Sequence, residues 1–157
     1  MQPQLARFGL LLWAILIVGC ATTNVRKIDR ATNPVTILCI EENPKVWVNE
    51  FLPFIETSFQ SYGIKTIVYQ ENSVPGSCEY ALSYTAFQLW DFVPYVYLAE
   101  IRIRRGTENI AMGRYNINRN QGGFLALNKW ASIETKMTPV IDELLIDFRN
   151  NKVGPKP

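Results

Sequence analysis

The spacing of apolar residues along the chain predicts alternating strands and helices after residue 35. Val35–Ile40 is a short β-branched run, typical of a buried strand. Apolar residues at helical spacing follow, and we expect that helix to begin near Asn49, whose side chain can cap it, and to end before Gly63. Ile64–Gln70 is a second apolar run. A strand, a helix and a strand in this order predict a right-handed parallel crossover.

Two long runs of alternating residues come next. Residues 79–90 and 95–104 alternate between two faces, and 110–117 forms a further strand, with a short strand possible at 124–127. Apolar residues from Trp130 to Phe148 then hold one helical phase, which Pro139 interrupts, so we expect a kink or a helix start near Thr138.

This β-α-β-β-β-α order predicts an α+β fold with two layers. The expected sheet is mixed, has four to five strands, and carries both helices on one face. The domain would cover residues 35–150, followed by a loose tail at 151–157.

The N-terminus has the pattern of an export signal. Arg7 precedes eleven apolar residues, 8–18, which would span roughly 17 Å as a helix and are too short to cross a bilayer. The run ends in Ile17-Val18-Gly19-Cys20, which resembles the lipobox of bacterial lipoproteins. The resemblance implies that residues 1–19 are cleaved and that Cys20 is acylated, with palmitate as a typical acyl chain. Ala21 after the cysteine implies the outer membrane, facing the periplasm. A buried N-terminal helix is the alternative.

We expect residues 20–34 to combine the acylated cysteine with a flexible, polar tether, because the segment lacks apolar periodicity. Export also changes the interpretation of the other two cysteines, Cys39 and Cys78. The periplasm is oxidising, so we predict a structural disulfide between them. Two buried free thiols are the alternative.

Composition narrows the possible functions. The chain has 157 residues, 48% of them hydrophobic, with 16 basic and 14 acidic side chains, and no histidine. The lack of histidine excludes Ser-His-Asp and Cys-His catalysis and imidazole zinc sites. No nucleotide-binding loop or calcium loop occurs, and no basic run indicates nucleic acid. We therefore expect no cofactor, no metal and no enzymatic activity.

The candidate interaction surface comes from the connection between the two long strands. Trp90, Phe92 and Tyr95 would lie near a hairpin end, where exposed aromatic rings are typical of binding surfaces. Arg102 and Arg104 on the second strand would add a basic patch for anionic headgroups or an acidic partner. Two alternatives stay open: the rings fold back into the core, or the arginines pair with Glu100 and Glu108 across the strands.

Several motifs point to one family. They are Cys39-Ile-Glu-Glu-Asn-Pro-Lys-Val46, Cys78-Glu79-Tyr80, Trp90-Asp91 and the run from Lys136-Met137-Thr138-Pro139 to Leu145. Together with the lipobox, they resemble a family of small Gram-negative outer-membrane lipoproteins whose function is not settled. The resemblance implies a localisation and a fold, and it supplies no catalytic residue.

The sequence thus favours a non-enzymatic, lipid-anchored envelope protein whose periplasmic domain acts as an interaction or adaptor module for another envelope component. The main alternative is a small-ligand or lipid-binding module, with a pocket between helices and sheet lined by Trp47, Phe51, Tyr84 and Tyr97. A hydrolase that uses Asp or Glu is a third possibility, and it requires two convergent carboxylates in one cleft.

Overall fold

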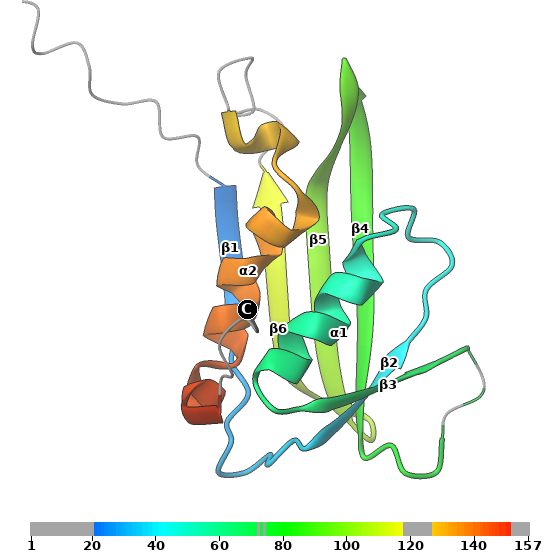
Figure 1. The fold of residues 1–157 in the computed structure, drawn as a ribbon, viewed down its shortest axis with the longest axis vertical. Coiled ribbons are helices and arrows are strands. Elements are labelled where there is room, and N and C mark those ends of the chain that lie inside the picture. The colour runs from blue at the N-terminus through cyan, green and yellow to red at the C-terminus, as the bar shows by residue number, and fades with distance from the viewer. Residues whose placement is uncertain (1–20, 72, 74, 118–126, 152–157) are drawn as a thin grey trace, which may run out of the picture.

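The computed structural model of the chain describes residues 21–71, 73, 75–117 and 127–151 (Figure 1). The expected leader at 1–19, Cys20, most of the possible strand at 124–127 and most of the tail at 151–157 lie outside these residues.

The fold is built on one mixed sheet of six strands in the order β1-β6-β5-β4-β2-β3 (Figure 1). The strands are β1 (Ala21–Arg26), β2 (Ile37–Glu41), β3 (Lys65–Tyr69), β4 (Tyr80–Asp91), β5 (Val93–Arg105) and β6 (Glu108–Ile117). Strand β2 is parallel to both β3 and β4, whereas the other neighbours are antiparallel. The predicted parallel pairing of the strands on either side of the first helix is therefore confirmed.

Helices cover one face of this sheet (Figure 1). They are α1 (Phe51–Ser61) and α2 (Ile133–Leu144), flanked by the 3-10 helices η2 (Leu127–Trp130) and η3 (Ile146–Asn151). Helix α1 buries Phe51, Ile55 and Phe59, which lie four residues apart on one side of the helix. Helix α2 approaches β6 so closely that a Cβ atom at Gly113 would lie 2.6 Å from Val140 Cγ1. The core fills the space between these helices and the sheet.

The expected fold class is wrong. The structure is 41% strand and 26% helical, and the single sheet has six strands rather than four or five. The protein is therefore mostly sheet and does not match the predicted two-helix sandwich. The additional strand is β1, which comes from the segment expected to be a tether.

The tether prediction for residues 20–34 is also wrong over the part that the structure describes. Strand β1 pairs with β6 from Ala21↔Ile117 to Arg26↔Met112. Its polar side chains gave no apolar pattern because an edge strand on a half-solvated sheet is held mainly by main-chain hydrogen bonds. Only the β-branched residues Thr22, Thr23 and Val25 indicated a strand.

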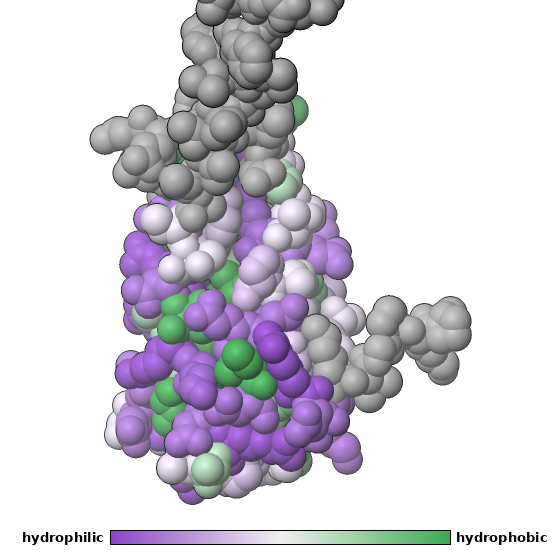
Figure 2. All heavy atoms as spheres, turned by 90° about the vertical axis from the view of Figure 1, so that its left-hand side faces the viewer, coloured by the Kyte–Doolittle hydropathy of each residue, from purple (hydrophilic) through white to green (hydrophobic). Residues whose placement is uncertain are grey.

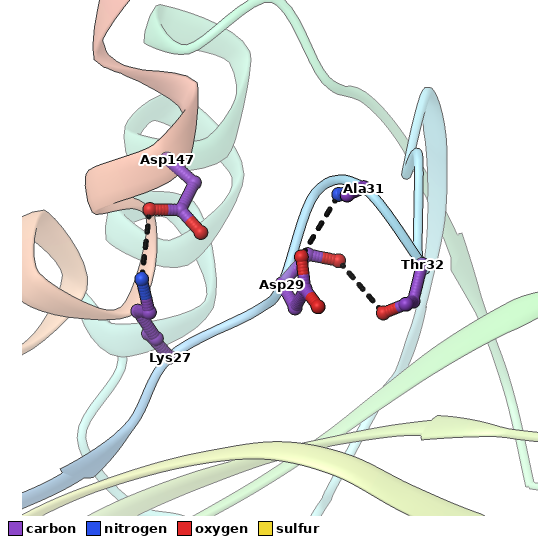
Figure 3. Close-up of polar contacts among 5 residues, drawn as sticks. All are labelled: Lys27, Asp29, Ala31, Thr32 and Asp147. Atoms are coloured by element: carbon purple, nitrogen blue, oxygen red, sulfur yellow. Dashed lines mark hydrogen bonds and ion pairs between the residues drawn. The ribbon is translucent and has the colours of Figure 1, made fainter.

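The chain after β1 is fixed as well (Figure 3). Ile28 is fully buried, and its N–H donates to the Leu144 carbonyl at 3.0 Å. Lys27 Nζ lies 3.0 Å from Asp147 Oδ1, and Asp29 Oδ1 accepts a hydrogen bond from the Ala31 N–H at 2.9 Å. The first two contacts attach residues 27 and 28 to the end of α2 and to η3, and the third closes a turn at residues 29–31, so this segment is part of the folded domain.

The helix ends differ in detail from the sequence expectation. Helix α1 begins after Glu50, without a side-chain cap, rather than at Asn49. Gly63 does follow its C-terminus, at a φ of 78° that favours glycine. Helix α2 begins after Ser132, whose side chain accepts a hydrogen bond from the Thr135 N–H, and it runs through Pro139 without starting near Thr138. The Ser132 cap therefore sets the start of this helix.

The predicted disulfide between Cys39 and Cys78 is confirmed. The bridge joins β2 to the segment just before β4, with the Cα atoms 5.7 Å apart and 39 residues of sequence separation. It links the parallel part of the sheet to the long antiparallel hairpin.

Candidate functional site

The β4–β5 hairpin ends in a tight apolar turn. Trp90 faces Pro94 and Asp91 faces Val93, which leaves Phe92 alone at the apex. Phe92 has a φ of 60°, a left-handed conformation that bulky residues rarely adopt. We call residues 87–94 the hairpin tip. Its two most exposed aromatic residues, Trp90 and Phe92, are 74% and 76% exposed.

Exposed apolar side chains are concentrated at this tip. The described residues include seven exposed large hydrophobic side chains, and four of them, Phe87, Trp90, Phe92 and Val93, belong to the tip. By contrast, the side of the molecule formed by β1 and α2 is mostly hydrophilic with small separate apolar spots (Figure 2). A cluster of exposed apolar residues on a folded protein is typical of a contact surface.

The tip is held from below by η2. The buried ammonium of Lys129 binds the Asp91 carboxylate, and the Trp130 Nε1–H donates to the Asp91 carbonyl at 3.3 Å. The same ammonium lies 4.5 Å from the centre of the Tyr95 ring. Asp91 is the only charged residue of the tip. Because Lys129 neutralises its carboxylate, the tip carries no unpaired charge.

A second buried lysine holds η2 in place. Lys136 on α2 is 4% exposed, and its Nζ donates to the carbonyls of Lys129 at 2.7 Å and Val96 at 2.9 Å. Burial lowers the pKa of Lys136 to about 8. On its other side lies Tyr115 of β6, whose ring centre is 5.8 Å from Nζ. Burial raises the pKa of Tyr115 to about 12, and its hydroxyl has no hydrogen-bond partner among the described residues.

Sequence reasoning missed these two lysines. The signal was present, because residues 129, 133, 136 and 140 share the three- to four-residue spacing of the apolar stripe. A lysine at such a position is buried when its ammonium finds partners in the fold.

The structure separates the five predicted surface residues into two groups. Trp90 and Phe92 are at the tip, and Tyr95 is half-buried just below it. Arg102 and Arg104 lie further along β5, on the sheet face that the helices do not cover. Arg102 Nε is 2.6 Å from Glu100 Oε1, and an Arg104 guanidinium nitrogen is 3.7 Å from Glu41 Oε2. The arginines are thus paired with acids of the same sheet, and they form no surface with the aromatic residues.

Two of the pockets on the described surface lie near the hairpin or contain a residue of the predicted pocket. The larger, about 530 Å³, is open and lies between the N-termini of both helices and the base of the hairpin, with Val48, Phe54, Tyr95 and Trp130 among its lining residues. The smaller, about 270 Å³, is lined by Glu41, Glu42 and Tyr84 among others.

The structure does not bring together all four residues that were expected to line a pocket. Trp47 is 83% exposed on a loop, and Phe51 is buried with its ring against Tyr84, 5.4 Å between centres. Tyr97 contacts Phe87 instead, with the ring centres 6.2 Å apart. Of the four residues only Tyr84 lines either of the two pockets described above.

Neither a metal-binding cluster nor a membrane-spanning helix is found among the described residues. No group of three or more Cys, Asp or Glu side chains is arranged to hold a metal ion within the described part of the chain. No helix in the same residues is long and apolar enough to span a bilayer.

Comparisons with known proteins add little. No family model matches the chain, and no curated protein matches it. Solved structures similar to it include the PelC dodecamer from Paraburkholderia phytofirmans and a point variant of that dodecamer, at 10% and 12% identity. Each has a TM-score of 0.46 and covers 77% of this chain and 97% of the other. We draw no conclusion from similarities at this level.

Proposed function

We propose that this protein is a non-enzymatic lipoprotein of the Gram-negative outer membrane, similar to the small envelope lipoproteins named above. Cys20 carries the lipid, the folded domain faces the periplasm, and the domain acts as an interaction module for another envelope component. The hairpin tip is the surface through which it contacts the envelope.

The observation that carries this proposal is the exposure of the tip. Four large apolar side chains lie in water at the end of a hairpin, and the apex residue, Phe92, has an unfavourable backbone conformation. A backbone strained by about 1–2 kcal/mol persists only where the surrounding structure holds it. The Lys129–Asp91 pair supplies such a brace. This arrangement keeps the aromatic rings available for binding at small additional entropy cost.

The lipid anchor is tested on the full chain expressed in a Gram-negative host. Intact mass and labelling with a fatty acid are measured for the wild type and for Cys20→Ala, together with membrane fractionation. We expect a shortened, acylated wild-type chain in the outer membrane and an unprocessed variant. An unprocessed, unlipidated wild-type chain in the cytosol would contradict the proposal.

The contact surface is tested by photo-crosslinking in cells. A photoreactive residue replaces Phe92 in one strain and Trp47 in another, because Trp47 is also largely exposed but lies on the loop before α1 rather than in the hairpin. We expect adducts from position 92 and few from position 47. Equal yields from both positions would show that the tip has no special contact.

The second candidate function, ligand binding, is favoured by the larger pocket. A volume of about 530 Å³ lies within the range of small-molecule sites, and its lining combines Val48, Phe54 and Trp130 with the carboxylates of Glu50 and Glu134. Titration calorimetry with lysophospholipids and fatty acids tests this alternative, with Thr57→Trp as the variant that fills the pocket. Binding by the wild type that the variant loses would favour it over the adaptor role.

A further inference from the structure

The chain enters the sheet at the same end as the hairpin tip. Across the sheet Ala21 pairs with Ile117, Asn116 pairs with Leu98, and Leu98 pairs with Phe87. Residue 21 therefore lies level with the start of the tip, three strands away. Figure 1 shows the start of β1 and the β4–β5 turn toward the same end of the molecule.

Distances along and across the strands follow from the register. Phe92 lies five residues beyond Phe87, so the apex extends roughly 16 Å past the level of Ala21. Three strand spacings separate β1 from β4, or roughly 14 Å. The line that joins the two points is therefore inclined at about 45° to the strands, and a flat surface that touches both points contains this line.

This geometry has a consequence if Cys20 is acylated, and the inference rests on that part of the proposed function. Cys20 immediately precedes β1, so no spacer separates the lipid from the folded sheet. The bilayer surface then lies within a few ångströms of residue 21. The hairpin tip is directed toward the same surface.

The chemistry of the tip suits a bilayer. Tryptophan is enriched at membrane interfaces, and the transfer of phenylalanine and valine side chains from water to an apolar environment is favourable. The only charge of the tip, on Asp91, is directed toward the buried ammonium of Lys129. Insertion of Trp90, Phe92 and Val93 would therefore place no unpaired charge in the membrane.

We propose that the hairpin tip inserts into the leaflet that holds the Cys20 lipid and forms a second membrane contact. Two contacts limit the domain to rotation about the line that joins them, whereas the lipid alone leaves the domain free to tilt in every direction. The tip thus restricts which surfaces of the domain face the periplasm.

Quenching of tryptophan fluorescence tests the insertion. The full-length lipidated protein is reconstituted in phosphatidylethanolamine and phosphatidylglycerol vesicles whose acyl chains carry bromine, a quencher that acts at short range. Trp90→Phe removes the reporter but keeps an apolar ring, and Trp47→Phe is the matched control. We expect quenching in the wild type and in Trp47→Phe, and its loss in Trp90→Phe. Equal quenching in all three proteins would overturn the proposal.

The crosslinking described above separates lipid from protein as the occupant of the tip. With a photoreactive residue at position 92, phospholipid adducts support insertion. Adducts with a protein and none with lipid would overturn insertion while supporting the interaction module. Acylation of Cys20, read from the intact mass of the same sample, tests the anchor separately.

Discussion

The pH dependence of stability should report the buried ammonium of Lys136. Burial lowers the pKa of this lysine from 10.5 to about 8. Between these values the unfolded chain binds the proton and the native protein releases it. The unfolded state then binds more protons than the native state, so the free energy of unfolding rises with pH. This gain is absent below pH 7, where Lys136 is protonated in both states.

The size of the gain follows from the difference in pKa. Each pKa difference of 1 corresponds to about 1.4 kcal/mol, and most of the difference is expressed between pH 7 and 9.5. We expect the free energy of unfolding to rise by no more than about 2 kcal/mol over that range. The pH range ends at about 9.5 because of the tyrosines. Burial raises the pKa values of Tyr69, Tyr80, Tyr84 and Tyr115 in the native protein. Above about pH 10 these tyrosines ionise in the unfolded chain first, which lowers the stability of the native protein.

Urea unfolding at pH 7.0, 8.0, 9.0 and 9.5 measures the effect. Lys136→Met removes the ammonium and should flatten the profile, whereas Lys65→Met, which alters an exposed lysine on β3, should leave the rise in place. Wild-type stability that stays constant or falls over this range would refute the reasoning. An equal rise in Lys136→Met would also refute it, because another group would then be responsible.

Three further predictions concern stability. Replacing Cys39 and Cys78 with alanine should cost about 4 kcal/mol, since the bridge closes a loop with a separation of 39 residues; the loss is measured by denaturant unfolding and should vanish when the wild type is compared under reducing conditions. Gly113→Ala should cost about 1–3 kcal/mol because its Cβ would overlap Val140, and an unchanged melting temperature would contradict this contact. Phe92→Asn should raise stability by up to about 1 kcal/mol, because asparagine tolerates a φ of 60° better, while it reduces crosslinking from a neighbouring tip position; lower stability would argue against strain at the apex.

Much of the fold was predictable from the chain. The strands predicted at 79–90, 95–104 and 110–117 follow from the alternation of apolar and polar residues, because the helices bury one face of the sheet. The parallel pairing around α1 follows from the order of its elements. The exposure of Trp90 and Phe92 was not predictable, because apolar rings near a hairpin end are compatible with both burial and exposure.

By itself the sequence determined most of the local helices and strands, because hydrophobic periodicity is a short-range property of the chain. It also determined the cysteine pair, because two cysteines allow only one intramolecular disulfide. Tertiary structure alone decided that residues 21–26 form an edge strand, since main-chain pairing leaves no side-chain pattern. It also decided that Lys129 and Lys136 hold the base of the tip, and that the tip and residue 21 share one end of the sheet. These facts depend on register between distant strands, and register is set only when the whole sheet assembles.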